Sequence, residues 1–218
     1  MKKIIFDLDG TLINSAPGIL LSLRHAFSRC GLSPIKKLEP GLIGPPLNDI
    51  LQSLLHPSDD EALDCLIQAF TEHYDRDGYR SSEPFSDVGE MLVALHQSEQ
   101  RVLYVATNKR YVPTQRILAF LGWESFFHGV YSIDSFQSKT STKAELLRRL
   151  LIHGNLNCHD CIYVGDRLED ADAALKNNIE FLGITFGLPV GAATVFTGDH
   201  RKASSVKSLS EQLCGIKL

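Results

Sequence analysis

Near its beginning the chain carries an apolar strand that runs directly into an acidic turn, in the string IIFDLDGTL. A short apolar run such as Ile4–Phe6, bounded by a turn signal, is typical of a strand buried on both faces of a parallel sheet. Asp7 and Asp9 then lie at the carboxyl end of that strand, where open α/β sheets bind ligands, and Gly10 allows a sharp turn beside them. The pattern suits a polar site with one carboxyl group as nucleophile and the other as proton donor; the alternative is a solvated turn, which D-x-D after a strand more often forms.

The stretch from residue 15 to residue 82 has helical character throughout. Apolar residues recur there at intervals of three and four, and no run has the character of a strand. Ser15 could cap the first helix, and a loop rich in proline and glycine follows it. Helices are expected over residues 19–27, 47–55 and 59–74.

From Val88 onward the pattern changes to helices that alternate with short apolar strands. Strands are expected over residues 102–106, 129–133, 161–164 and 181–184, and helices over 112–121, 142–152, 168–176 and 209–214. Such alternation predicts an α/β, Rossmann-like, mostly parallel sheet with helices on both faces. We therefore expect a core domain of residues 1–14 and 83–218, into which an all-helical domain of residues 15–82 is inserted.

Composition excludes several classes of function. Of 218 residues, 44% are hydrophobic and 22% charged, and the net charge of −4 favours neither nucleic acid nor an anionic membrane as a partner. No apolar run approaches a membrane span, and Asp7 interrupts the first one too early for a signal peptide. These features predict a cytoplasmic protein and leave open whether it is a monomer or a homodimer.

The five cysteines are odd in number and widely scattered, which argues against a disulfide framework. Cys158 and Cys161 form a single C-x-x-C, and two further zinc ligands at a compatible spacing are not evident. The sequence thus predicts free thiols.

Polar residues follow two of the later strands. Thr107 and Asn108 come after strand 102–106, where a hydroxyl and backbone N–H groups suit an anion, although such residues more often form a helix cap. Asp166 and Asp170 follow strand 161–164 and share one side of the next helix. Two such carboxylates repel unless a cation lies between them, and Mg²⁺ suits oxygen ligands; the alternative is an acidic helix N-terminus.

In this order, the strings DLDGT, TN and GDRLED, with a lysine between the last two, resemble the four motifs of the haloacid dehalogenase-like hydrolases, especially their phosphatases. Lys139 and Lys143 compete for the lysine position. Lys143 is preferred because the string KAELL resembles the helix start of these phosphatases. The resemblance spans essentially the whole chain, and the relatives it indicates are phosphoglycolate phosphatases and 5′-nucleotidases.

The resemblance also implies a role for each motif residue. Asp7 would attack phosphorus and form an aspartyl-phosphate, while Asp9 would serve as acid and then as base. Thr107, Asn108 and Lys143 would bind the phosphoryl group. Mg²⁺ would be held by Asp7, the backbone carbonyl of Asp9, Asp166 and Asp170, the last directly or through water.

The helical block resembles the mobile cap of such phosphatases. Its string GPPL resembles the family's G-x-P-L loop, which makes Gly44 and Pro45 candidate substrate contacts; the alternative is a rigid interhelix loop. The expected activity is Mg²⁺-dependent hydrolysis of a small phosphate ester, with phosphoglycolate or a nucleoside 5′-monophosphate as leading substrates. A phosphomutase and a non-hydrolytic phospho-Asp switch remain alternatives, and residues 186–200 have no assigned role.

Overall fold

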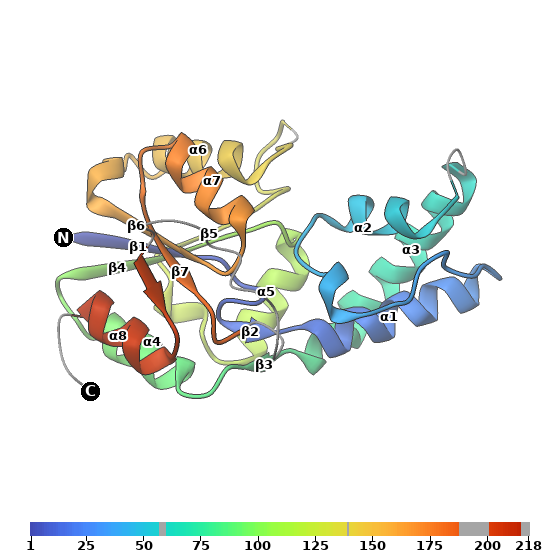
Figure 1. Ribbon diagram of the computed structural model, residues 1–218, viewed down its shortest axis with the longest axis horizontal. Coiled ribbons are helices and arrows are strands. Elements are labelled where there is room, and N and C mark those ends of the chain that lie inside the picture. Colours follow the sequence, from blue (N-terminus) through green and yellow to red (C-terminus); the bar gives the residue numbers. More distant parts are fainter. Residues whose placement is uncertain (57–59, 139, 188–200, 215–218) are drawn as a thin grey trace.

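Six parallel strands form the central sheet of the protein, in the order β5-β4-β1-β6-β7-β8 (Figure 1). The structure is a computed structural model that describes residues 1–56, 60–138, 140–187 and 201–214. The strands are β1 (Lys2–Phe6), β4 (Arg101–Thr107), β5 (Gly129–Ser132), β6 (Cys161–Gly165), β7 (Glu180–Ile184) and β8 (Arg201–Ala203). The predicted parallel α/β sheet is confirmed, and β8 is a strand that the sequence pattern did not reveal.

Strand β1 lies between β4 and β6, so it occupies the middle of the sheet. Phe6, its last residue, pairs with Val105 on one side and with Val164 on the other. The chain therefore returns to both sides of β1, and the polar residues after β1, β4 and β6 meet at one edge. Such a topological switch point is where open α/β sheets bind ligands.

The sheet is covered on both faces, which explains the unbroken apolar run of β1. Ile4 and Phe6 point into one hydrophobic cluster and Ile5 into another, and all three are fully buried. In Figure 1, α6 and α7 lie on one side of the sheet and α4 and α8 on the other. The covering helices are α4 (Val88–His96), α5 (Tyr111–Phe120), α6 (Lys143–His153), α7 (Leu168–Lys176) and α8 (Val206–Cys214).

The helical insertion, residues 16–81, projects from the end of the sheet at which β1 terminates (Figure 1). Its own hydrophobic cluster includes the fully buried Leu23, Leu51 and Leu66, one from each of its three α-helices. It contains α1 (Ala16–Arg29), α2 (Leu47–Leu54), α3 (Asp60–Arg76) and two 3₁₀ turns (Pro40–Leu42 and Gly78–Ser81). None of the described helices combines the length and apolar character needed to cross a bilayer.

A short antiparallel ribbon joins the insertion to the sheet. Strand β2 (Ile13–Asn14) pairs with β3 (Glu83–Pro84), so the outgoing and returning chain segments are held together. With two residues each, these strands are too short to show an alternating pattern, and the sequence did not predict them.

The expectation of free thiols was wrong for one pair of cysteines. Cys30 and Cys65 form a disulfide, with their Cα atoms 6.2 Å apart. Cys30 follows α1 and Cys65 lies in α3, and these two helices pack against each other. The pairing depends on that helix packing, which the spacing of cysteines along the chain does not reveal. Cys158 and Cys161 are free.

Candidate active site

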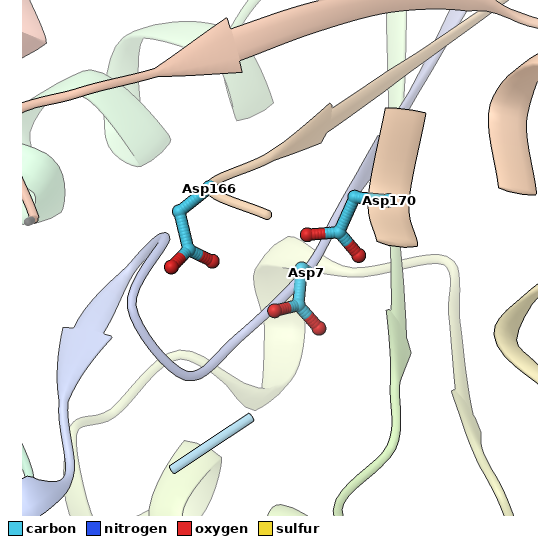
Figure 2. A group of neighbouring side chains, drawn as sticks. All are labelled: Asp7, Asp166 and Asp170. Carbon is cyan, nitrogen blue, oxygen red and sulfur yellow. The ribbon is translucent and has the colours of Figure 1, made fainter. Parts of the chain in front are cut away.

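Three buried carboxylates converge at the carboxyl edge of the sheet (Figure 2). Asp7 follows β1, Asp166 follows β6, and Asp170 lies in the first turn of α7. One carboxylate oxygen from each lies within 4.8 Å of the other two. The spacing of four residues does place Asp166 and Asp170 on one side, as the sequence predicted.

The turn after β1 passes unusually close to Asp166. Gly10 has a φ of +84°, and a Cβ atom there would lie 2.5 Å from Asp166 Oδ2. Glycine alone permits both the backbone conformation and this approach. One residue on, Thr11 Oγ1 donates a hydrogen bond of 3.2 Å to Asp166 Oδ1, which orients this carboxylate.

Lys143 is the cation that faces these carboxylates. It is the first residue of α6, where Thr142 caps the helix by accepting a hydrogen bond from Glu145 N. Its Nζ donates to Asp7 Oδ1 at 2.6 Å and lies 3.3 Å from Asp170 Oδ1. Burial works to lower the pKa of Lys143, but the two carboxylates raise it overall, so the ammonium stays charged.

The carboxylates outnumber this single ammonium. Burial and the negative charge of Asp170 and Asp166 raise the pKa of Asp7 to about 8, although Lys143 opposes the shift. Burial and Asp170 likewise raise the pKa of Asp166 to about 7. Such a set of buried oxygen donors is stabilised by a further cation, and its chemistry fits Mg²⁺.

Asp170 is the most enclosed of the three carboxylates, with 1% of its surface exposed. Its oxygens accept hydrogen bonds from Tyr163 Oη at 3.0 Å and from Arg167 N at 3.1 Å, besides the contact with Lys143. Protein groups therefore take up most of the hydrogen-bond-accepting capacity of the Asp170 carboxylate. This agrees with a supporting role in metal binding, either directly or through water.

Asp9 has a different set of partners. Lys109 Nζ lies 3.0 Å from Asp9 Oδ2 and donates to Tyr74 Oη of α3 at 3.1 Å. Ser15 Oγ donates to Asp9 Oδ1, so its side chain does not cap α1 as the sequence suggested. Lys109 thus connects the turn after β4 with both Asp9 and the insertion. In the sequence, the only indication that Lys109 belongs to the site was its position directly after Thr107 and Asn108.

A cavity of about 560 Å³ lies between the sheet edge and the insertion, with Asp7 and Asp9 in its wall. Thr107 and Asn108 also line it, and so do Gly44 and Pro45. The positions of these four residues agree with contacts to the phosphoryl group and to the rest of a substrate. Lys143 meets Asp7 directly, whereas Lys139 lies outside the described residues.

Two buried polar atoms beside this cavity have no hydrogen-bond partner within the described protein. They are Asn108 Oδ1 and Thr140 Oγ1, and both residues line the cavity. Buried polar atoms are rarely left unpaired, so these two favour a bound polar ligand. Thr140 was missed by the sequence analysis, because it lies in a serine- and threonine-rich loop without a distinguishing pattern.

The loop that carries Gly44 is bound to the sheet edge by two contacts. Asn108 Nδ2 donates to Gly44 O at 3.3 Å, and the Arg167 guanidinium donates to Ile43 O. Arg167 directly follows Asp166 in the sequence, and its hydrogen bond to Ile43 reaches the insertion, which comes close only in the folded protein. The residue next to Asp166 therefore holds the loop.

Replacing Gly44 by Ala is expected to lower kcat/KM for a phosphate ester by roughly tenfold, about 1.4 kcal/mol. Gly44 has a φ of +128°, and a Cβ atom there would lie 2.1 Å from Arg167 Nη1. The Arg167 guanidinium would therefore have to move and lose its hydrogen bond to Ile43 O. Gly41→Ala is the matched control, because its Cβ would meet nothing within 4 Å. Steady-state kinetics of both variants measure the change in kcat/KM. Equal losses of kcat/KM in Gly44→Ala and Gly41→Ala would contradict the prediction.

Comparison with known proteins gives a match to one protein family and to several named relatives. The sequence profile of a family described as haloacid dehalogenase-like hydrolase matches residues 4–184. The chain is 33% identical to tyrosine-protein kinase PtkA of Mycobacterium tuberculosis (strain ATCC 25618 / H37Rv) over 188 residues, 85% of this chain but only 62% of PtkA. The chain therefore spans less than two thirds of that relative.

Two further relatives match over more of their length. A 5′-nucleotidase of Pseudomonas aeruginosa is 30% identical over 85% of this chain and 83% of its own. A phosphoglycolate phosphatase of Agrobacterium fabrum is 29% identical over 84% of this chain and 80% of its own. A crystal structure described as a predicted phosphatase from Clostridium acetobutylicum has a TM-score of 0.85 at 26% identity, over 99% of both chains.

Proposed function

The chain belongs to the haloacid dehalogenase-like hydrolases, and from this premise we propose that it is a Mg²⁺-dependent phosphomonoester hydrolase. Its substrate is a small phosphate ester, with phosphoglycolate and nucleoside 5′-monophosphates as the leading candidates. The observation that carries the proposal is the position of Asp7. Its carboxylate is 2.6 Å from Lys143, belongs to the three-carboxylate cluster and lines the cavity with Asp9.

In this mechanism Asp7 attacks phosphorus and becomes an aspartyl-phosphate while the alcohol leaves. Asp9 gives its proton to the leaving oxygen and later takes one from the water that hydrolyses the intermediate. The Thr107 hydroxyl, Asn108 and the Lys143 ammonium hold the phosphoryl oxygens. Preorganised groups of this kind stabilise the charge that develops in the transition state.

The residues that would hold Mg²⁺ are Asp7, Asp166 and the backbone carbonyl of Asp9, with Asp170 as support. When bound, the cation supplies positive charge to the phosphoryl oxygens and to the nucleophile. The fit rests on three buried carboxylates within 4.8 Å that face a single ammonium. Thr11 and Gly10 keep Asp166 in place for this role.

The helical insertion would act as a cap that closes over the cavity. In support, residues 15–82 contain a hydrophobic cluster of their own, and the short β2–β3 ribbon connects them to the sheet. We place the boundary of the core domain at residues 1–14 and 83–218. Closure would exclude water from the aspartyl-phosphate until the alcohol has left.

The test is release of inorganic phosphate from p-nitrophenyl phosphate, measured with Mg²⁺ and with EDTA, and then from natural esters. Metal-dependent turnover is the expected result. If Asp7 becomes labelled by a small phosphodonor without turnover, the protein is a phospho-Asp switch. Interconversion of sugar phosphates would indicate a phosphomutase.

Mg²⁺ is also expected to raise the thermal stability of the protein. It would relieve the repulsion among Asp7, Asp166 and Asp170, and a ligand at a hundred times its Kd stabilises the folded state by about 2.7 kcal/mol. Differential scanning fluorimetry with MgCl₂, against NaCl at equal ionic strength, measures the shift in Tm. The Asp166→Asn variant should lose most of the shift, and an unchanged shift in that variant would exclude Asp166 as a ligand.

A further inference from the structure

Apolar and aromatic side chains form a large part of the wall that the insertion contributes to the cavity. Phe70 and Tyr74 of α3 belong to this wall, with 5% and 2% of their surfaces exposed. Their rings stack on each other, with centroids 5.3 Å apart at an interplanar angle of 12°, and Lys109 Nζ lies 4.8 Å from the centroid of the Tyr74 ring. Ile50 of α2 and Ile67 of α3 extend this surface, and Phe136 faces the cavity from the loop after β5. An aromatic ring of a ligand could pack here with its faces in apolar contact.

The cationic side chains that line the cavity already have anionic partners. Lys109 is paired with Asp9 at 3.0 Å. Arg110 donates two hydrogen bonds to Asp75, of 2.6 and 3.1 Å. Among the described lining residues, no positive charge is left to pair with an anionic group on the leaving alcohol.

The remaining charged groups of the lining are carboxylates. Asp49 and Asp134 both line the cavity and are exposed. They disfavour a second negative charge on the substrate, because like charges repel across a cavity. A carboxylate on the leaving group would thus meet two negative charges and no free positive one among the described lining residues.

Neutral polar side chains complete the cavity. Asn48, Thr71 and Gln137 line it and can donate or accept hydrogen bonds. The volume of about 560 Å³ falls in the range of roughly 300–1,000 Å³ that is typical of pockets for drug-sized ligands. A two-carbon alcohol would leave most of this space, and the aromatic wall, without contact.

We propose that this cavity selects phosphate esters whose leaving group is an uncharged nucleoside and rejects esters with a carboxylate, such as phosphoglycolate. This inference rests on the proposed function and decides between its two leading substrates. The base would pack against Phe70 and Tyr74, and the neutral polar side chains would meet the hydroxyl and base-edge groups. Hydrolysis then converts a nucleoside 5′-monophosphate and water into a nucleoside and inorganic phosphate; Asp9 donates its proton to the leaving 5′-oxygen and regains one from the water.

The experiment compares kcat/KM for adenosine and uridine 5′-monophosphates, ribose 5-phosphate, tyrosine phosphate and phosphoglycolate, with Mg²⁺ present. We expect at least one nucleotide to exceed both phosphoglycolate and ribose 5-phosphate by tenfold or more. A preference for phosphoglycolate, or for tyrosine phosphate over every nucleotide, would overturn the inference. Turnover of p-nitrophenyl phosphate in the same preparation keeps the proposed function intact in either case. Absence of p-nitrophenyl phosphate turnover would instead count against both the proposed function and this inference.

Two variants test the wall itself. Thr71→Arg adds a cation to a half-buried position of the cavity and should shrink the ratio of nucleotide to phosphoglycolate kcat/KM at least tenfold. Phe70→Leu keeps the site apolar but removes the ring, and should raise KM for nucleotides more than for ribose 5-phosphate. Leu21→Ala, at an exposed position of α1 outside the cavity lining, is the control. Unchanged ratios in both Thr71→Arg and Phe70→Leu would refute the role of this wall.

Discussion

Asp7→Asn should abolish phosphate release, with kcat falling by about 10⁴-fold or more. The amide that replaces the carboxylate cannot attack phosphorus, so the aspartyl-phosphate cannot form. The measurement is single-turnover and steady-state release of phosphate from the best ester. Mass spectrometry of acid-quenched enzyme should show the phosphate adduct in the wild type and none at residue 7 in the variant.

Loss of the fold would not explain this result. The variant removes one negative charge from a buried cluster, and Lys143 keeps Asp170 as a partner at 3.3 Å. We therefore expect the Tm of the Mg²⁺-free variant to equal or exceed that of the wild type. Asp160→Asn makes the same chemical change in a partly buried pair with Lys3, outside the candidate site, and its activity should stay normal. Near-normal turnover by Asp7→Asn would refute the nucleophile assignment.

Lys143→Met should impair both activity and stability. Lys143 Nζ contacts Asp7 and Asp170 from a position that is 3% exposed, so its removal leaves buried carboxylates without their cation. Removing one partner of a buried ion pair typically costs about 3–5 kcal/mol of unfolding free energy. Loss of a group that stabilises phosphoryl charge should also lower kcat by about 10²–10³-fold. Urea unfolding in EDTA and steady-state kinetics measure the two effects.

Two other lysines provide controls for this variant. Lys207 is exposed on α8, and its replacement by Met should change neither kcat nor the free energy of unfolding. Lys139→Met addresses the competing assignment of the motif lysine. A larger kinetic loss in Lys139→Met than in Lys143→Met would reverse that assignment. A larger stabilisation by Mg²⁺ in Lys143→Met than in the wild type would further show that charge, and not side-chain volume, is responsible.

Local pattern predicted the elements that carry the motifs. The apolar run of residues 102–106 is β4 in the structure, and the helix expected to begin near residue 142 begins at Lys143. Both signals are local, because an apolar run and a helix-capping residue are recognised from neighbouring positions in the sequence. The same holds for α7, whose first turn carries Asp170.

The partners of the site residues could not be predicted in this way. Lys109 was adjacent to a recognised motif, yet its contacts with Asp9 and Tyr74 join segments that are far apart in the sequence. The disulfide between Cys30 and Cys65 likewise depends on how α1 packs against α3. Strand β8 was missed because its three residues, Arg201–Ala203, form no apolar run. Its pairing with β7 is visible only in the folded protein.

The sequence by itself determined the alternation of elements, the position of each carboxylate at a strand end or helix start, and the family to which the chain belongs. These properties follow from the order and spacing of residues along the chain. Tertiary structure alone decided which side chains meet: Lys143 with Asp7, Arg167 with the loop at Ile43, and the aromatic wall of the cavity. The physical reason is that contact, burial and charge pairing depend on how distant segments pack. That packing cannot be derived from the spacing of residues along the chain.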